Sequence, residues 1–249
     1  MSKTRAGKTR GRSKSGTAES RWAEVDRYLS EHLLGSDAIL ESALEASAKA
    51  ELPPISVSPN QGKLLQMLAQ IVDARSILEV GTLAGYSTIW LARGLRSGGQ
   101  VITLEVDSKH AEVAKRNFKH AGLQKVIELR LGNALETLPK LFAEGRGPFD
   151  LIFIDADKPS IPAYFEWALK LSHSGTLIMV DNVVRDGGVI DADSTDPSIQ
   201  GVRRFIEMLG MESHATGTAI QTVGIKGYDG FAIVLVGAGP QELENPRAE

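Results

Sequence analysis

The chain has 249 residues, 42% hydrophobic and 24% charged, with a formal net charge of -3 and no cysteine. This length suits one α/β domain with a buried sheet, because two full domains would be cramped. The missing cysteine excludes disulfides, thiolate metal sites and a cysteine nucleophile, and the low net charge excludes whole-protein attraction to nucleic acid or membrane. No apolar run approaches a membrane span, and no hydrophobic segment follows the basic N-terminus, so a cytoplasmic protein without membrane attachment is expected.

The charge is unevenly distributed along the chain. Residues 1–18 carry six basic side chains and no acid, whereas the remainder carries 22 basic and 31 acidic residues. With almost nothing to bury, residues 1–18 are predicted to be a disordered tail, with a nucleic-acid-binding arm as the alternative. Order is expected from about Ser20, with a helical segment over 19–57, a domain over 58–237 and a C-terminal tail over 238–249.

Apolar side chains at helical spacing predict two helices in the N-terminal segment, one marked by Trp22 and Leu33 and the other by Ile39. A third helix is predicted to begin at Ser58, because Pro59 suits a first helical position and a Ser-x-x-Gln capping box follows.

From residue 76 onward, short apolar runs alternate with amphipathic stretches. This alternation predicts a parallel sheet covered by helices on both faces. The expected strands are 76–80, 101–105, 126–131, 149–155 and 176–181, and the expected helices lie near 86–97, 108–121, 134–143 and 160–171.

Beyond this alternation, Asp196 and Pro197 mark the start of another helix, which is expected to run to about Leu209. Two further strands, 218–223 and 231–236, are expected to be separated by a turn at 227–230.

A glycine-bearing loop follows the first core strand, at the edge where open α/β sheets bind ligands. Gly81 and Gly85 allow a tight turn and close approach to a ligand. Their G-x-x-x-G spacing places Leu83 where a dinucleotide site has its second glycine, so a nucleoside is indicated rather than a pyrophosphate.

An acid stands at the distance expected for ribose recognition. Glu105 ends the second strand, and its two oxygens can accept hydrogen bonds from both ribose hydroxyls; the alternative is a solvated strand end. The third strand ends in Gly132-Asn133-Ala134, which is small enough for backbone to lie beside a flat base, although such residues also mark simple turns.

Oxygen-bearing side chains end the next two strands. Asp155 ends the fourth strand, and Asp181 with Asn182 ends the fifth. Because consecutive strands in such folds are commonly neighbours, these side chains are expected to converge. Oxygen-only ligands favour Mg²⁺, Mn²⁺ or Ca²⁺ over zinc or copper, and two adjacent oxygens of a catechol could fill open positions.

This set suggests a reaction. A cation acting as a Lewis acid would help a hydroxyl lose its proton and hold its oxygen for attack on a positioned methyl group. Lys158 could take that proton, since a nearby cation favours the neutral amine. In the alternative reading, Asp155 and Asp157 cap the next helix and Lys158 is solvated.

Three motifs together resemble the cation-dependent O-methyltransferase family, which includes caffeoyl-CoA and catechol O-methyltransferases and small bacterial relatives. They are Glu-Val-Gly-Thr-Leu-Ala-Gly-Tyr-Ser at 79–87, Phe-Ile-Asp-Ala-Asp-Lys at 153–158, and Asp-Asn at 181–182, and the resemblance covers roughly residues 20–237.

The resemblance implies a class I methyltransferase fold, a Rossmann-like doubly wound α/β sheet of seven strands with the last antiparallel and helices on both faces. It also implies a homodimer and a small catechol-like or phenolic substrate. The implied metal ligands are Asp155, Asp181 and Asn182, and the implied base is Lys158. The implied S-adenosylmethionine site comprises Val57 through its backbone, Glu79, Gly81, Thr82, Ser87, Glu105, Ala134 and Asp157.

Two positions depart from the plant caffeoyl-CoA pattern. Arg185 stands where those enzymes have a tryptophan, and Asp186 stands where they have a substrate-contacting asparagine. The chain therefore resembles more closely the bacterial members, which methylate catechols and flavonoids. The resemblance also implies that residues 183–195 form a substrate-side loop and that the helical segment over 19–57 covers the active site.

Three other functions compete with this interpretation. A nicotinamide-dependent dehydrogenase explains the sheet and Glu105 but not the missing G-x-G-x-x-G or the oxygen cluster. A methyltransferase acting on RNA could use the basic tail, but Asp-Ala-Asp-Lys stands where base-methylating enzymes have a motif resembling Asn-Pro-Pro-Tyr. A non-catalytic binding protein could keep the fold, although the intact cofactor loop and metal ligands oppose this.

Overall fold

A computed structural model describes residues 17–237. The tail predicted over 238–249 and most of that predicted over 1–18 lie outside the described residues. The first helix, α1 (Ala18–Leu33), begins two residues before the expected start of order at Ser20, because Thr17 accepts a hydrogen bond from the Ser20 backbone N–H and caps it.

The central feature is a seven-stranded sheet with the order β3-β2-β1-β4-β5-β7-β6, in which β7 alone is antiparallel to its neighbours. This is the sheet that the family resemblance implied. The strands are β1 (Ser76–Val80), β2 (Gln100–Glu105), β3 (Ile127–Leu131), β4 (Phe149–Ile154), β5 (Ser172–Asp181), β6 (Ala215–Gly224) and β7 (Gly227–Val236).

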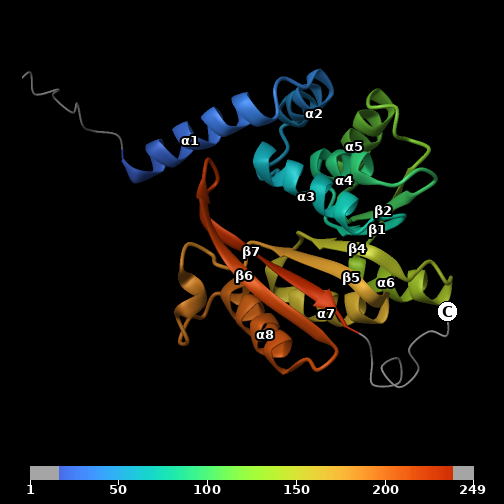
Figure 1. The fold of residues 1–249 in the computed structure, drawn as a ribbon, viewed down its shortest axis with the longest axis vertical. Helices are drawn as coiled ribbons and strands as arrows, with labels where there is room; N and C mark the ends of the chain where they lie inside the picture. Colours follow the sequence, from blue (N-terminus) through green and yellow to red (C-terminus); the bar gives the residue numbers. More distant parts are fainter. Residues whose placement is uncertain (1–16, 238–249) are drawn as a thin grey trace, which may run out of the picture.

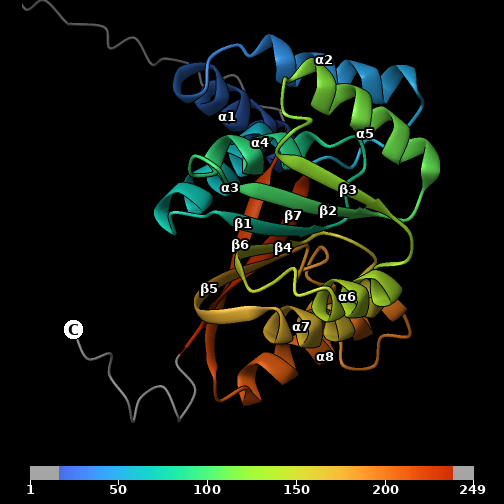
Figure 2. The same ribbon diagram turned by 90° about the vertical axis from the view of Figure 1, so that its right-hand side faces the viewer.

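Helices cover both faces of the sheet, as the continuous apolar strands predicted (Figures 1 and 2). One layer holds α3 (Pro59–Ile71), α4 (Tyr86–Gly94) and α5 (Ser108–His120), with α2 (Ala38–Lys49) packed outside it. The other holds α6 (Ala134–Ala143), α7 (Ile161–Lys170) and α8 (Pro197–Met211). The remaining helices are the short 3₁₀ turns η1 (Lys158–Ser160) and η2 (Gly188–Ile190).

Each face of the sheet has its own apolar core. Phe153 points into the core under α3, α4 and α5, whereas Ile152 and Ile154 point into the core under α6, α7 and α8. All three side chains are fully buried. Because β4 is buried on both faces, it holds the polar residues that directly follow it at the edge of the buried sheet.

Two local expectations need correction. The turn expected at 227–230 is wrong, because β7 already begins at Gly227 and the hairpin turns at Ile225 and Lys226, between the paired residues Gly224 and Gly227. At the start of α3, Ser58 accepts from the Gln61 backbone N–H as predicted. The Gln61 side chain, however, is a hydrogen-bond partner of Asp181, where it helps to stabilise the carboxylate.

Within residues 17–237, every helix is too short or too polar to cross a membrane.

Candidate active site

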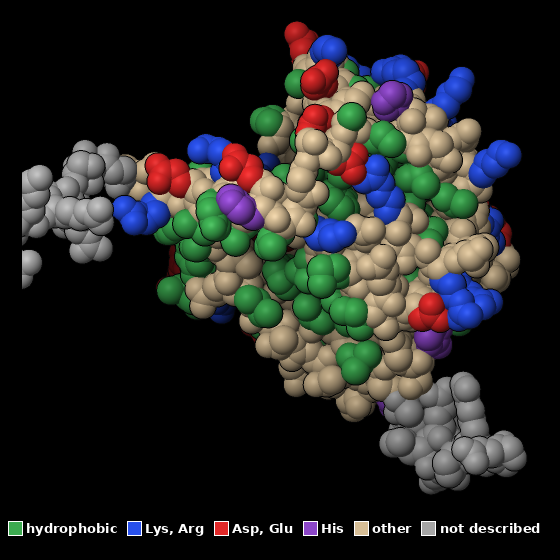
Figure 3. Space-filling view, turned by 45° about the horizontal axis from the view of Figure 1, so that its top comes forward, with side chains coloured by type: hydrophobic (Ala, Val, Ile, Leu, Met, Phe, Trp, Pro, Cys, Tyr) green, Lys and Arg blue, Asp and Glu red, His purple; other side chains and the backbone are tan. Residues whose placement is uncertain are grey.

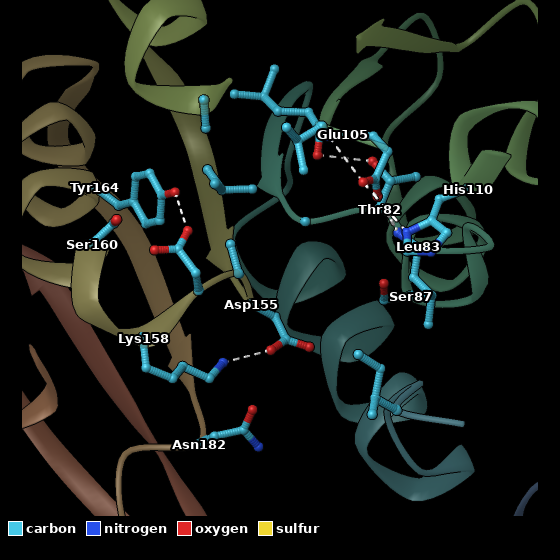
Figure 4. Close-up of a pocket in the computed structure, with 18 of the residues that line it drawn as sticks. Thr82, Leu83, Ser87, Glu105, His110, Asp155, Lys158, Ser160, Tyr164 and Asn182 are labelled. Carbon is cyan, nitrogen blue, oxygen red and sulfur yellow. Dashed lines mark hydrogen bonds and ion pairs between the residues drawn. The ribbon is translucent and has the colours of Figure 1, made fainter. Parts of the chain in front are cut away.

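A cavity of about 770 Å³ opens at the carboxyl ends of the central strands. The loops that follow β1, β2, β3 and β4 all contribute to its wall (Figure 4). Most of the residues singled out from the sequence line it: Val57, Gly81, Thr82, Ser87, Glu105, Ala134, Asp155, Asp157, Lys158 and Asn182.

The loop after β1 needs its glycines for space as well as for conformation. Gly81 has φ +104°, and a Cβ there would overlap the backbone carbonyl of Asp155. Gly85 has φ +81°, and a Cβ there would overlap the ring of Phe118. Between them, Leu83 adopts φ +51°, which costs a non-glycine residue about 1–2 kcal/mol. This strained loop brings backbone to the cavity wall.

Glu105 holds this loop from the neighbouring strand. One carboxylate oxygen accepts the Leu83 backbone N–H at 2.7 Å, and the other accepts the N–H groups of Val106 and Asp107 at 2.9 Å each. The side chain is only 7% exposed, so the alternative of a solvated strand end is wrong. His110 lies 3.6 Å from the same carboxylate and lines the cavity beside it (Figure 4).

Glu79 lies in the protein interior and does not line the cavity. It is fully buried and accepts hydrogen bonds from the hydroxyls of Ser87, Thr88 and Thr103 at 2.5–2.6 Å. Burial raises its pKa to about 7, against the opposing effect of those three hydroxyls. In this structure Glu79 therefore contacts the cavity only through Ser87, which it orients.

Asp157 and Tyr164 form a pair on the opposite wall. The Tyr164 hydroxyl donates to Asp157 at 2.5 Å. Burial, with the Asp157 carboxylate, raises the pKa of Tyr164 well above its ordinary range. Asp157 makes no side-chain capping bond to the turn that follows, so the helix-cap alternative is wrong for this residue. Its remaining acceptor capacity is available to a ligand.

Lys158 and Asp155 form an ion pair, with Nζ 2.8 Å from Oδ1 (Figure 4). Lys158 is only 9% exposed, so the alternative of a solvated lysine is wrong. An ammonium this well buried is retained only with a charged partner. The pair therefore places one proton-carrying group directly against one predicted metal ligand.

Asp181 and Asn182 complete the cluster. Asn182 lies beside Asp155 and Lys158 in the cavity wall (Figure 4). Burial raises the pKa of Asp181 to about 7, and the nearby charge of Asp155 adds to the effect, against the opposing influence of Lys158. Asp155 and Asp181 are therefore near enough for their charges to interact, and Asn182 lines both of the cavities that these two residues face.

The cluster separates the first cavity from a second one of about 480 Å³. Asp155 faces the first cavity, Asp181 faces the second, and Asn182 lines both. The second cavity is walled by α3, the loop after β5 and the β6–β7 hairpin; its lining includes Gln61, Leu64, Arg185, Lys226, Tyr228 and Phe231.

The donor set fits a hard divalent cation. Two carboxylates and an amide oxygen are ligands that such ions accept, and a positive charge between the carboxylates would relieve their repulsion. Within residues 17–237, no cluster of three or more His, Cys, Asp or Glu side chains could hold a metal. A cation here therefore depends on Asn182 and on oxygens from solvent or substrate.

Sequence reasoning missed two of the lining residues, Tyr164 and His110, and it assigned Arg185 to the substrate side alone although Arg185 lines both cavities. Tyr164 lies in α7 and Asp157 precedes η1, so their contact depends on the turn between them and nothing in the sequence signals it. The contributions of His110 and Arg185 likewise depend on how loops from separate strands pack.

The chain matches a known protein family over most of its length. The model of the family described as O-methyltransferase matches residues 30–235. A catechol O-methyltransferase from Niastella koreensis is 55% identical over 212 residues, covering 85% of this chain and 96% of that protein. A catechol O-methyltransferase from Mycobacterium tuberculosis is 51% identical over 213 residues, covering 86% and 95%.

Solved structures agree in fold. An O-methyltransferase from Bacillus cereus, in complex with S-adenosylhomocysteine, superposes with a TM-score of 0.86 at 56% identity, covering 87% of this chain and 99% of that one. TomG from Streptomyces achromogenes, an O-methyltransferase in complex with S-adenosylmethionine, gives 0.87 at 48% identity, covering 90% and 100%.

These matches exclude the nicotinamide-dependent dehydrogenase and the non-catalytic protein that the sequence left open. The chain belongs to the O-methyltransferase family, in the small bacterial, cation-dependent group that its motifs predicted, and it is an S-adenosylmethionine-dependent O-methyltransferase.

Proposed function

We propose that the enzyme methylates one of two adjacent hydroxyls of a small catechol-like substrate, with a divalent cation held by Asp155, Asp181 and Asn182. The observation that carries this proposal is the position of those three oxygen donors, on the boundary between two cavities. The names of two relatives, both catechol O-methyltransferases, support the substrate class.

S-adenosylmethionine would occupy the larger cavity. Glu105 would accept a hydrogen bond from a ribose hydroxyl, because three backbone N–H groups leave about one of the four acceptor sites of its carboxylate open. Asp157, fixed by Tyr164, would accept from the ammonium group of the methionine part. Val57, Gly81, Thr82, Ser87 and Ala134 would form the close walls, and Glu79 would act through Ser87.

The cation, Mg²⁺, Mn²⁺ or Ca²⁺, would supply Lewis acidity toward the substrate hydroxyls when bound. The chain's contribution is to fix its place: Asp181 is buried at 6% exposure, and its backbone neighbour Asn182 donates an N–H to it at 2.9 Å.

The acceptor would lie in the smaller cavity. Leu64, Tyr228 and Phe231 offer apolar surface to a flat ring, and the oxygen cluster lies at one end. Arg185 and Asp186, which replace the tryptophan and asparagine of the plant pattern, also line this cavity. This departure from the plant pattern favours a small catechol over caffeoyl-CoA.

Lys158 would take the phenolic proton. In the transfer, the sulfur–methyl bond breaks and its electron pair stays on sulfur, while an oxygen lone pair forms the new bond to the methyl carbon. The hydroxyl proton must leave, and the amine of Lys158 lies 2.8 Å from Asp155 and faces the same cavity. Positioning of the two reactants supplies much of the remaining rate.

A homodimer is the proposed assembly. α1 has no buried residue in the single chain. Its apolar residues Val25, Tyr28 and Leu33 have 51%, 60% and 72% of their surface exposed to solvent. It packs against β6, whose Ile220 is 48% exposed. Hydrophobic side chains gather on the surface beside the arm that α1 forms (Figure 3). An apolar face of this extent favours a second copy of the chain.

The substrate class is tested by the rate at which S-adenosylmethionine is converted to S-adenosylhomocysteine in the presence of paired diols. With Mg²⁺ present, catechol and ring-substituted catechols should be methylated, whereas resorcinol, whose hydroxyls are not adjacent, should react at least about 100-fold more slowly because it cannot chelate. Equal rates on catechol and resorcinol would contradict chelation by adjacent oxygens. No turnover of any catechol would overturn the substrate class.

A further inference from the structure

The loop that carries Asn182 has an unusual backbone. Asn182, Arg185 and Asp186 have φ of +59°, +55° and +53°, and Gly187 follows at +83°. Non-glycine residues adopt this region rarely, and a run of them persists only where the surroundings fix it. Something outside the loop must therefore hold it in this shape.

Asp229, from β7, makes the contacts that do so. Its Oδ1 accepts the backbone N–H groups of Val184 and Arg185 at 3.0 Å each, and that of Gly230 at 2.9 Å. Its Oδ2 faces the Arg185 guanidinium at 3.8 Å. Successive N–H groups converging on one carboxylate form an anion-binding nest, and such charge-assisted bonds are strong.

The β7 backbone reinforces this contact. The Val183 N–H donates to the Gly230 carbonyl at 3.0 Å. A Cβ at Gly230 would overlap the Val184 side chain and the Ile220 carbonyl, so β7 and the loop are in direct contact. Val183 and Val184 are buried at 1% and 6% exposure, so the Val184 N–H needs an acceptor from within the protein, and Asp229 supplies it.

We propose that Asp229 is a positioning residue for the cation site, which holds the loop that aims Asn182 at Asp155 and Asp181. This inference rests on the proposed cation. Asp229 itself would touch neither the ion nor the methyl donor, since both of its oxygens face the loop. Its effect reaches the ion through the backbone of 182–185.

A role limited to stability would give a different result from a role in positioning. If Asp229 only stabilised the hairpin, removing it would lower the melting temperature without changing the affinity for a cation. If it positions Asn182, cation affinity falls while the cavity for S-adenosylhomocysteine, built on β1, β2 and β4, keeps its affinity.

The experiment measures Mn²⁺ binding by titration calorimetry, with S-adenosylhomocysteine bound, in the full-length wild type, Asp229→Ala and Asp229→Asn. Asp229→Ala should weaken Mn²⁺ binding at least about ten-fold, the usual effect of losing a group that orients a metal ligand. Asp229→Asn keeps an acceptor oxygen and should stay within about three-fold of wild type. S-adenosylhomocysteine affinity, which also reports folding, should be the same in all three.

Asp186→Asn is the matched control for charge. It removes a carboxylate from the same loop, and its side chain has no hydrogen-bond partner anywhere in residues 17–237. It should change Mn²⁺ affinity far less than Asp229→Ala. Wild-type Mn²⁺ affinity in Asp229→Ala would overturn the positioning role alone, as would an equal loss in Asp186→Asn. Failure of the wild type to bind Mn²⁺ would instead overturn the cation and this inference together.

Discussion

The Nζ of Lys158 lies 2.8 Å from Oδ1 of Asp155, and both side chains line the cavity assigned to the methyl donor. The separation of three residues across the start of η1 brings the two groups together. Lys158 is thus within reach of any hydroxyl that approaches Asp155, and as a neutral amine it would accept the proton of that hydroxyl.

Replacement of Lys158 by alanine should lower kcat more at neutral pH than at alkaline pH, because hydroxide and the ionised phenol replace a missing base only when pH is high. A loss of about 100-fold near pH 7 is expected for removal of a general base. A pH–rate profile from pH 6.5 to 10, compared with Lys158→Arg to keep the ion pair, provides the measurement. Parallel profiles for wild type and Lys158→Ala would argue against the proton-transfer role.

Gly81→Ala should impair cofactor binding. It places a methyl group against the Asp155 carbonyl at a φ of +104°, so S-adenosylhomocysteine affinity should fall at least about ten-fold. Gly98→Ala is the matched control, because Gly98 also has a positive φ, +80°, but has no atom within 4 Å of the added Cβ. Both variants should lose stability, and only Gly81→Ala should lose affinity in titration calorimetry. Comparable affinities would show that the tight loop does not shape the site.

Glu79 should make stability fall as pH rises. Burial raises its pKa from 4.5 to about 7, so the fold favours the protonated carboxyl more than the unfolded chain does. Its stabilising effect is fully present below pH 4.5 and is lost as pH rises to about 7, by roughly 3 kcal/mol. Urea unfolding of the metal-free enzyme between pH 5 and pH 8 measures this.

Burial raises the pKa of Asp181 to about 7 as well, so Asp181 also contributes to the decline in the free energy of unfolding over this pH range. Comparison of the wild type with Glu79→Gln isolates the part of the decline that comes from Glu79. The glutamine variant should show a smaller decline in the free energy of unfolding across this interval. If wild type and Glu79→Gln decline in parallel, Glu79 is ionised throughout and the predicted linkage is absent.

Tyr28→Glu and Ile220→Glu should shift the protein toward the monomer, because each places a charge in the apolar face formed by α1 and β6. Light scattering on size-exclusion fractions at micromolar concentration should give a dimer for wild type and a dissociation constant raised at least about ten-fold in these variants. Met211→Glu is the control, since Met211 is 79% exposed at the end of α8, on the other face of the sheet. A monomeric wild type would contradict the proposed assembly.

The fold was accessible from the sequence because its signals are local. Residues 151–154 form a run that is apolar throughout, which is typical of a strand buried on both faces. The polar residues that end these strands, Glu105 and Asp155, then fall at one edge of the sheet, so most of the cavity followed from strand ends alone.

What the sequence did not reveal depends on contacts between distant segments. The composition of residues 227–230 is typical of a turn, yet pairing with β6 extends β7 through Gly227 and Asp229, ahead of the residues that pair with β5. Asp229 therefore looked like a turn residue, although it holds the loop after β5 from 45 residues away. Glu79 likewise sits beneath the cavity, because Thr103 of the neighbouring strand and Ser87 of α4 satisfy it there.

The central claim is that Asp155, Asp181 and Asn182 hold a divalent cation required for methyl transfer. The most direct test measures how fast S-adenosylhomocysteine forms while catechol is methylated, first in excess chelator and then after Mg²⁺ is added back. The account predicts a loss of at least about 100-fold, recovery with Mg²⁺ in the wild type but not in Asp155→Ala, and unchanged S-adenosylhomocysteine binding throughout. Full activity in excess chelator would contradict it.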